Sequence, residues 1–473
     1  MKLRALLSLF AAFGISLALF VATDEVRSFT PAQTKASGNA TVLSSIDELI
    51  KFSSAHTGLP VRVCVRGHLI DRDGLRQRVQ ARMRMEGVEE RLRRSSVVLK
   101  KLGLLPRDFD YPGYFLSARL SSSLAGFYDP VTCQFYILDS VPPHERESMM
   151  AHELTHALQD QYLGLEKWMN PGAGEDDATG IGERLLARRA LSEGQAMAVM
   201  YDYALAPYSQ KLTDLPGIDQ FLAQTPVAPA KGSSPSEAPP YVRESSIFPY
   251  IYGLQFVAAV LKQQGNHRDF GAALKDPPLN THQVMHPGAY LNGENLAPLK
   301  LPPLESVLGS GFEKLDSGTL GEFDVLMFAK QFGSAEKASQ IAAAWRGGYY
   351  FVARSTRGSN TGAAATPPSS NARSAFRAGE VDLFYLSSWD TPDAATRFAS
   401  LYAASIPRRY PRATPVVKST ESARQFPPSF HNLQWDTSEG PVSIEARGTL
   451  VLALEGFDTP TASKLRAISI PSP

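Results

Sequence analysis

The sequence predicts an α+β protein with a mostly helical region, a small sheet upstream of its main helices, and a smaller α+β region towards the C-terminus. Two observations lead to this prediction. Long helical patterns at residues 145–163 and 183–205 follow two strand-like segments, and from about Tyr349 strands alternate with a single helix. We therefore expect one domain over residues 41–345 and a second domain, of unassigned role, over residues 346–473.

An export segment occupies residues 1–22. Lys2 and Arg4 precede an uncharged apolar run, residues 5–22, that is just long enough to span a bilayer. The pattern is typical of a signal peptide or of an uncleaved membrane anchor, and the sequence does not separate the two. In both cases we expect the rest of the chain, after a linker at residues 23–40, to lie outside the cytoplasm, either secreted or periplasmic.

The elements between these segments follow from apolar periodicity and from the Gly and Pro residues that end it. We expect helices, strands and loops in this order: helix 72–102, a hairpin of strands 124–128 and 134–138, helices 145–163 and 183–205, loop 207–249, helix 251–264, loop 277–303, helices 320–331 and 335–345, strands 349–354 and 381–387, helix 392–404, and strands 442–446 and 449–454.

Charge and cysteine content exclude some function classes. A formal net charge of +1 gives no indication of a nucleic-acid partner, and the basic stretch 62–107 is typical of the solvated face of a helix. Cys64 and Cys133 each lie in a strand-like stretch and form no CxxC pair, so a cysteine zinc site is not expected. In an exported chain they form either one disulfide or two buried thiols.

The strongest chemical signal is the sequence HELTH at residues 152–156. Residues four apart on a helix project from one face, so His152 and His156 can reach one metal ion at about 2.0–2.1 Å. Glu153 points to the side of that face, where a general base acts on a metal-bound water. Its apolar neighbours place the motif on a half-buried helix, which distinguishes it from histidines scattered over a solvated surface.

A catalytic zinc requires a third protein ligand. Gln159 and Tyr162 stand where a metzincin would have Gly and His, and the inverted HxxEH motif is absent. A glutamate on the next helix remains, and Glu193 is the first candidate because its small neighbours would let that helix approach closely. The alternatives are the helix residue Glu183 and three loop acids: Glu175, Asp176 and Asp177.

HELTH in a helix, a strand pair upstream and Glu193 downstream resemble the zincin metallopeptidases of the gluzincin, or thermolysin-like, type. Over residues 124–290 the segments GFYDP, QFYIL, AHELTHALQDQ and ALSEGQA also resemble exported bacterial zincin-like proteins without assigned substrates. The resemblance implies a zincin-like fold for the helical domain. It also implies Zn²⁺ held by His152, His156 and Glu193, with Glu153 as general base.

The chain departs from the thermolysin-like pattern at Met197, where those enzymes have an aspartate that orients a ligand histidine. Asp160, one turn beyond His156, is our candidate for that role. His286 is our first candidate for the donor that stabilises the oxyanion, ahead of four others: Tyr201, Tyr252, His282 and Tyr290. By family analogy, an extended substrate would bind along strand 134–138, which we expect to be an edge strand.

These observations predict an exported zinc-dependent metallopeptidase that cleaves a peptide or protein substrate through a zinc-activated water. The alternative is a non-catalytic zincin-fold protein that binds or scaffolds in the cell envelope. A membrane tether through residues 5–22, removal of a pro-segment at residues 27–105 and the oligomeric state stay open. The C-terminal aromatic residues are expected to form core, with a substrate platform as the alternative: Trp345, Tyr349, Tyr350, Trp389 and Trp435.

Overall fold

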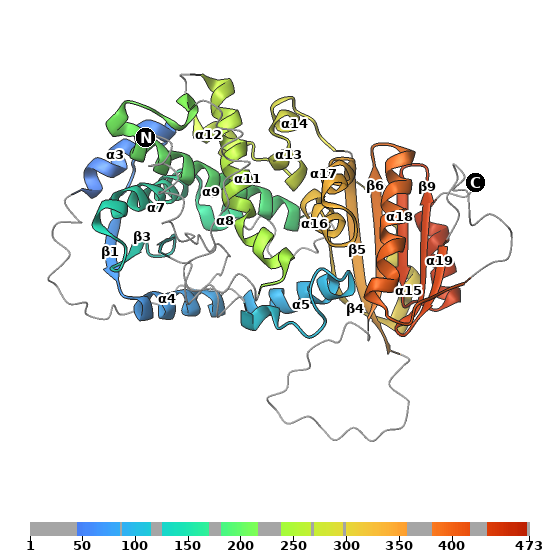
Figure 1. The fold of residues 1–473 in the computed structure, drawn as a ribbon. Helices are drawn as coiled ribbons and strands as arrows, with labels where there is room; N and C mark the ends of the chain where they lie inside the picture. The colour runs from blue at the N-terminus through green and yellow to red at the C-terminus, as the bar shows by residue number, and fades with distance from the viewer. Residues whose placement is uncertain are drawn as a thin grey trace.

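Two long antiparallel helices form the core of the helical half of the structure, a computed structural model (Figure 1). α7 (Pro143–Leu163) and α9 (Ile181–Leu205) lie where the apolar periodicity predicts them, and they pack against each other. α3 (Ile46–Thr57) covers α7 from the other side. The structure describes residues 45–85, 88–114, 125–169, 181–215, 238–265, 269–296, 299–356, 381–416 and 433–470.

A three-stranded sheet lies beside α7. β2 (Gly126–Asp129) and β3 (Gln134–Leu138) form the expected antiparallel hairpin, and β1 (Arg66–Ile70) adds to it in parallel with β3. The strand order β1-β3-β2 makes β3 the central strand. The expectation that residues 134–138 form an edge was therefore wrong, because β1 arrives from far upstream and pairs with the exposed side of the hairpin.

Cys64 and Cys133 lie just before the paired strands β1 and β3. Both are exposed free thiols, so the structure contains neither the expected disulfide nor the buried thiols that were its alternative. The backbone of Cys133 has a positive φ of 53° in the turn that leads into β3. The apolar strands begin only after each cysteine, which leaves both side chains outside the core.

The segment at residues 72–102 forms two helices, α4 (Arg72–Met85) and α5 (Val88–Lys101), where we expected one. The predicted export segment, the linker and the part of the pro-segment before residue 45 lie outside the described residues. Within the described ranges, none of the helices has the length and apolar character needed to cross a membrane.

α11 (Pro240–Gln264) lies along α9 and begins eleven residues earlier than the predicted helix. Pro240 stands in its first turn, where a missing N–H costs nothing, so the proline that suggested a loop instead starts the helix. Close contact between α9 and α11 depends on two glycines. A Cβ on Gly194 would lie 2.2 Å from the carbonyl oxygen of Gly253, and a Cβ on Gly253 would lie 2.1 Å from the carbonyl oxygen of Ala190.

Short helices connect α11 to the second half of the chain. They are α12 (Phe270–Lys275), α13 (Thr281–Met285), α14 (Pro287–Leu291) and α15 (Leu304–Leu308), while α8 (Leu165–Met169) follows α7. α13 begins with an Asn280 side chain that accepts a hydrogen bond from the Gln283 N–H, and Pro287 ends it by starting α14.

The second half contains a seven-stranded sheet in the order β4-β5-β6-β10-β9-β8-β7. Its strands are β4 (Phe312–Gly318), β5 (Trp345–Ser355), β6 (Asp382–Trp389), β7 (Thr414–Pro415), β8 (Leu433–Thr437), β9 (Gly440–Arg447) and β10 (Leu450–Glu455). The sheet thus begins before residue 346, because β4 pairs with β5 across an insertion of two helices, α16 (Glu322–Phe332) and α17 (Ala335–Ala343).

Helices cover both faces of this sheet, which explains why its central strands are apolar on both sides. α16, α17 and α18 (Pro392–Arg409) lie on one face, while α15 and α19 (Thr459–Ser469) cover the other. Four of the C-terminal aromatic residues lie in the core around this sheet, since Trp345, Tyr349, Tyr350 and Trp389 are only 2–7% exposed. A substrate platform built from these four side chains is therefore excluded.

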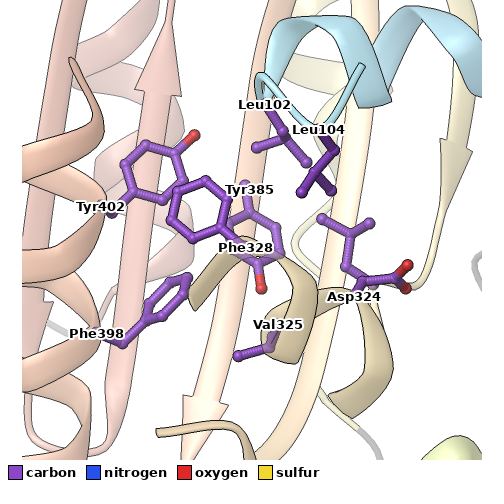
Figure 2. A pocket seen from close by; sticks show the side chains of 9 residues that line it. Leu102, Leu104, Asp324, Val325, Phe328, Tyr385, Phe398 and Tyr402 are labelled. Carbon is purple, nitrogen blue, oxygen red and sulfur yellow. The ribbon is translucent and has the colours of Figure 1, made fainter. Parts of the chain in front are cut away.

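The two halves meet along a junction that contains a small apolar cavity. A cavity of about 10 Å³ lies between the end of α5, α16, β6 and α18, and aromatic side chains such as Phe328, Tyr385 and Tyr402 line it (Figure 2). It holds at most one water molecule. Nearby, the Arg409 guanidinium donates to the carbonyl oxygen of Lys101 over 2.6 Å and pairs with Glu455 over 2.8 Å, which fastens α5 to the second sheet.

Candidate metal centre

Three buried side chains from two helices meet at one point. The Nε2 atoms of His152 and His156 are 3.1 Å apart, and Glu193 Oε2 lies 3.4 Å and 3.5 Å from them. Ligands held tetrahedrally at about 2.0–2.1 Å from zinc lie about 3.3 Å from one another. The three donor atoms are therefore already spaced as the corners of a zinc coordination sphere.

The centre is enclosed on all sides. His152 is 3% exposed, His156 and Glu193 are 0% exposed, and Glu153 is 1% exposed. α7 is buried over an unbroken run from Ser148 to Gln159, because the small sheet, α3 and α9 surround it. The helix therefore presents the motif to the protein interior, in contrast to the half-buried helix that we expected.

Gln159 orients the imidazole of His156. Its Oε1 atom lies 2.9 Å from His156 Nδ1 and accepts a second hydrogen bond from Ser192 over 2.8 Å. Its amide nitrogen donates to the Ser192 carbonyl oxygen and to Gln195 Oε1 over 2.9 Å. With the amide fixed in this way, His156 Nδ1 carries a proton and Nε2 is the nitrogen that faces Glu193. Nε2 donates to Glu193 when it is protonated and can bind a metal ion when it is not.

Asp160 has a different role from the one predicted. Its Oδ2 atom accepts a hydrogen bond from the Tyr128 hydroxyl over 2.8 Å, and its Oδ1 atom accepts one from the Leu165 N–H over 2.8 Å. The side chain thus joins β2 and the start of α8 to α7. Sequence spacing could not separate residues three and four positions beyond His156, since both lie on its side of the helix.

Glu153 lies beside strand β2. A Cβ on Gly126 would be 3.3 Å from Glu153 Oε1, so the carboxylate lies against a strand that has no side chain at this position. β2 is also an edge strand in the order β1-β3-β2. The strand that lies at an edge of the sheet and beside the candidate base is thus β2, in place of the predicted β3.

Tyr250, which sequence reasoning missed, completes the surroundings of Glu193. Its hydroxyl donates to Glu193 Oε1 over 3.3 Å from α11. The Gly194–Gly253 contact brings the two helices close enough for this bond. The predicted candidate Tyr252 lies two positions further along α11 and stacks on Phe248 with ring centroids 4.8 Å apart. A pairing of Glu193 with a tyrosine could have been inferred only from knowledge that α9 and α11 touch.

Opposing effects set the protonation of the centre. Burial raises the pKa of Glu193, but the hydrogen bonds from His152 and His156 outweigh it and hold that pKa far below its usual range. Burial lowers the pKa of His156, yet Glu193 and Glu153 overcome this effect and raise it. The site therefore attracts positive charge, whether as a proton shared with the histidines or as a metal cation.

His286 and the rival Glu183 lie elsewhere. His286 Nε2 bonds Glu322 Oε1 over 2.7 Å, and this hydrogen bond is the main cause that raises the His286 pKa. Glu183 accepts hydrogen bonds from the N–H and hydroxyl of Thr281 over 2.9 Å and 2.8 Å. Glu183 is about 15 Å from Glu193 along α9, so this second cluster is remote from the first.

The remaining candidates are also accounted for. His282 belongs to the cluster with His286, and the Tyr290 hydroxyl donates to the Asp276 carbonyl oxygen over 2.7 Å. Tyr201 is buried in α9 and its pKa is raised by burial. The three loop acids Glu175, Asp176 and Asp177 lie outside the described residues. Among the predicted third ligands, Glu193 is the one that the structure places against both histidines.

No family model, no curated protein and no solved structure matches this chain. The interpretation of the centre therefore depends on its geometry alone.

Proposed function

We propose that the protein is an exported zinc-dependent metallopeptidase, with His152, His156 and Glu193 as the zinc ligands. The observation that carries the proposal is the spacing of the three donor atoms, 3.1–3.5 Å, which brackets the ligand separation of tetrahedral zinc. Two imidazoles and one carboxylate also match a catalytic zinc set, which keeps a fourth position for water. A zinc ion at this point would supply Lewis acidity and an acidified water.

The residues around the centre have distinct roles in this proposal. Glu153 accepts the proton of the attacking water and returns it to the leaving amine. Gln159 and Tyr250 are positioning residues, which hold His156 and Glu193 respectively. The edge of β2 offers backbone hydrogen-bonding groups to an extended peptide next to Glu153. Because the centre is 0–3% exposed, the residues that cover it have to move before a peptide bond reaches Glu153.

The same burial favours a second candidate, a zincin-fold protein that holds zinc without catalysis in the cell envelope. Structural zinc sites are closed, whereas catalytic sites keep one position open to water and substrate. Glu153 separates the two candidates, because a structural site has no use for a buried carboxylate beside the metal ligands.

Peptide hydrolysis and metal content should be measured together for wild type, Glu153→Gln and the control Glu147→Gln. Glu147 is an exposed glutamate on the same helix. We expect zinc in all three proteins, with hydrolysis lost in Glu153→Gln and retained in Glu147→Gln. Equal hydrolysis by the two variants, or none by zinc-loaded wild type on a broad peptide library, would refute the peptidase proposal. Zinc retained without hydrolysis would support the structural role.

A further inference from the structure

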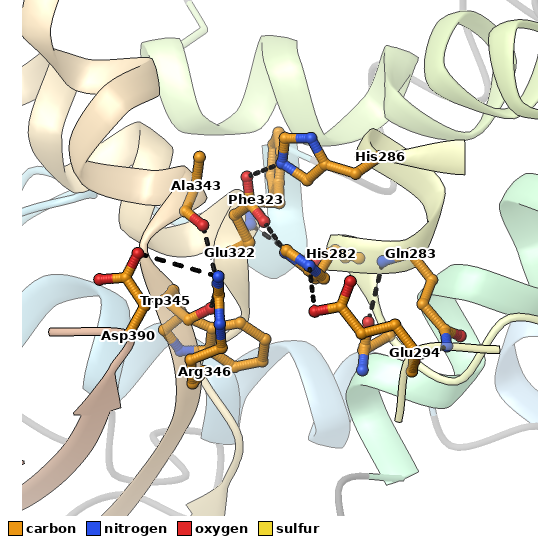
Figure 3. A network of polar contacts seen from close by, with 12 residues as sticks. His282, Gln283, His286, Glu294, Glu322, Phe323, Ala343, Trp345, Arg346 and Asp390 are labelled. Carbon is orange, nitrogen blue, oxygen red and sulfur yellow. Dashed lines mark hydrogen bonds and ion pairs between the residues drawn. The ribbon is translucent and has the colours of Figure 1, made fainter. Parts of the chain in front are cut away.

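A second pair of histidines four residues apart meets a buried glutamate at the junction of the two halves (Figure 3). His282 lies in α13, His286 stands at the break between α13 and α14, and Glu322 begins α16. His282 Nδ1 is 2.5 Å from Glu322 Oε2, and His286 Nε2 is 2.7 Å from Glu322 Oε1. One donor atom from each residue lies within 4.8 Å of the others.

We propose that His282, His286 and Glu322 form a second site for a divalent transition-metal ion of the zinc class, separate from the first centre. The donor set is two imidazoles and one carboxylate, which zinc and its neighbours in the first transition series favour. The side chain of Glu322 is 1% exposed, and the two rings are its hydrogen-bond partners. Buried carboxylates of this kind are stabilised by hydrogen bonds, by a paired positive charge or by a coordinated metal ion.

The surroundings already orient His282 as a ligand. Its Nδ1 atom faces Glu322, and its other nitrogen, Nε2, lies 3.8 Å from Glu294 Oε1. A carboxylate behind a ligand imidazole fixes its tautomer and increases its basicity, as in many zinc sites. Glu294 is half-exposed, so this interaction reaches solvent.

Hydrogen bonds and one close glycine contact hold the three elements together around the site. Thr281, next to His282, donates to Glu183 of α9 and accepts a hydrogen bond from the Phe323 N–H of α16 over 3.2 Å. Gly321 precedes Glu322, and a Cβ there would overlap the Glu183 carboxylate at 2.0 Å. The site thus lies where α9, α13 and α16 meet, and an ion in it would link the helical half to the half that contains the second sheet.

Nearby charge does not exclude a cation. Arg346 is the positive side chain that acts on His286, but its guanidinium is directed elsewhere. It donates to the carbonyl oxygens of Ala343 and Trp345 over 2.8 Å and 2.7 Å and lies 3.8 Å from Asp390. Glu322 and Glu294 together supply more negative charge at the histidines than Arg346 offsets.

Metal binding requires a small expansion of the cluster. The distances from His282 Nδ1 and His286 Nε2 to the Glu322 oxygens are 2.5 Å and 2.7 Å. On metal binding they would increase towards the separation of tetrahedral zinc ligands, about 3.3 Å. His286 has room for this movement, because its side chain is 41% exposed. That exposure also gives an ion a route from solvent.

The proposal is tested by counting Zn²⁺ after equilibrium dialysis of the purified chain, with elemental analysis per folded protein. We expect about two equivalents in wild type and about one in His286→Ala, His286→Gln or the double variant His152→Ala/His156→Ala. His286→Gln keeps an amide donor for Glu322 and guards against loss of folding. The control His144→Ala removes a histidine that is 79% exposed and should leave the count unchanged.

Two results would overturn the second site. One is a wild-type chain that holds a single equivalent and loses it in the double variant, which would show that the second cluster is only hydrogen-bonded. The other is a His286→Gln protein that holds as much Zn²⁺ as wild type. Co²⁺ absorption gives an independent measurement. Tetrahedral bands should appear in the double variant His152→Ala/His156→Ala and should be absent when that variant also carries His286→Gln. Neither outcome bears on Glu153-dependent hydrolysis, so the two proposals can fail separately.

Discussion

The two His-Glu clusters of this molecule contain the same residue types and differ in how the backbone presents them. In both, the histidines stand four residues apart with ring centroids 4.8 Å from each other, and a buried glutamate comes from another helix. In the first cluster α7 is continuous, and both rings present Nε2 to Glu193. In the second, the helix breaks at His286, and one ring presents Nδ1 while the other presents Nε2.

This difference in backbone leads to different donor spacing. The first cluster holds its donor atoms 3.1–3.5 Å apart in a closed interior, whereas the second holds them in direct hydrogen bonds of 2.5 Å and 2.7 Å with one ring open to solvent. A His-x-x-x-His spacing thus identifies a candidate ligand pair. Whether the pair reaches the spacing that a metal requires depends on the course of the helix and on the position of the carboxylate.

The substitution Glu193→Gln should have the largest effect on the difference in Zn²⁺ affinity between the two clusters. The neutral amide removes the negative ligand, so we expect Zn²⁺ affinity at the first centre to fall by more than the roughly 10–100-fold typical of outer residues. The second cluster should keep its ion. Competition with a chromophoric chelator measures this, and an unchanged affinity at the first centre would mean that Glu193 is not a ligand.

Gly194→Ala tests whether the helix contact forms the first centre. The added methyl group would meet the backbone of Gly253 at 2.2 Å, which should lower the free energy of unfolding by about 1–3 kcal/mol or more and displace Glu193. Urea unfolding and metal content provide the readouts. Gly288→Ala in α14 is the matched control, because its Cβ would enter open space, and it should have little effect.

Gln159→Leu should weaken Zn²⁺ binding at the first centre by about 10–100-fold, since His156 loses the group that fixes its tautomer. Asp160→Asn, one residue further, should leave that affinity unchanged, because Asp160 bonds Tyr128 and Leu165. If instead Asp160→Asn weakened Zn²⁺ binding and Gln159→Leu did not, Asp160 would be the residue that orients a ligand histidine, as the sequence predicted.

The smallest effect is the pH dependence of the metal-free protein. Glu193, whose pKa is lowered, stabilises the fold above about its ordinary 4.5 and loses this contribution as pH falls through its folded value. His156, whose pKa is raised, stabilises below about 6.5 and loses its contribution as pH rises through its folded value. The pair should therefore contribute most between these values.

With zinc bound, the stability of the fold should rise with pH above about 6.5, where that of the metal-free protein falls. The reason is that ligation requires a deprotonated imidazole and strengthens as pH rises. Thermal melts from pH 5 to pH 8, with chelator and with excess Zn²⁺, measure both trends. A thermal midpoint of the chelated protein that rises through this range, in a manner that depends on His156, would contradict the assignment.

Local signals predicted much of the fold. The helices α7 and α9, the β2–β3 hairpin and most strands of the second sheet followed from apolar periodicity and turn residues. The predictions were wrong where distant segments meet: β1 covers the outer side of β3, β4 joins the second sheet across two helices, and Pro240 starts a helix that buries itself against α9. These outcomes depend on which surfaces come together, and no local pattern encodes that choice.

The same division applies to the sites. The sequence by itself determined that His152 and His156 share one face of a helix with Glu153 beside it, because helical geometry is local. Only the tertiary structure decided that Glu193 faces both rings, that Gln159 in place of Asp160 holds His156, and that Tyr250 reaches Glu193. The tertiary structure also places His286 beside Glu322, in a second cluster. The contacts of Glu193 and Glu322 join residues on different helices, and Gln159 is held against His156 by Ser192 and Gln195 of α9. All of them depend on how the helices pack, which is a property of the whole chain.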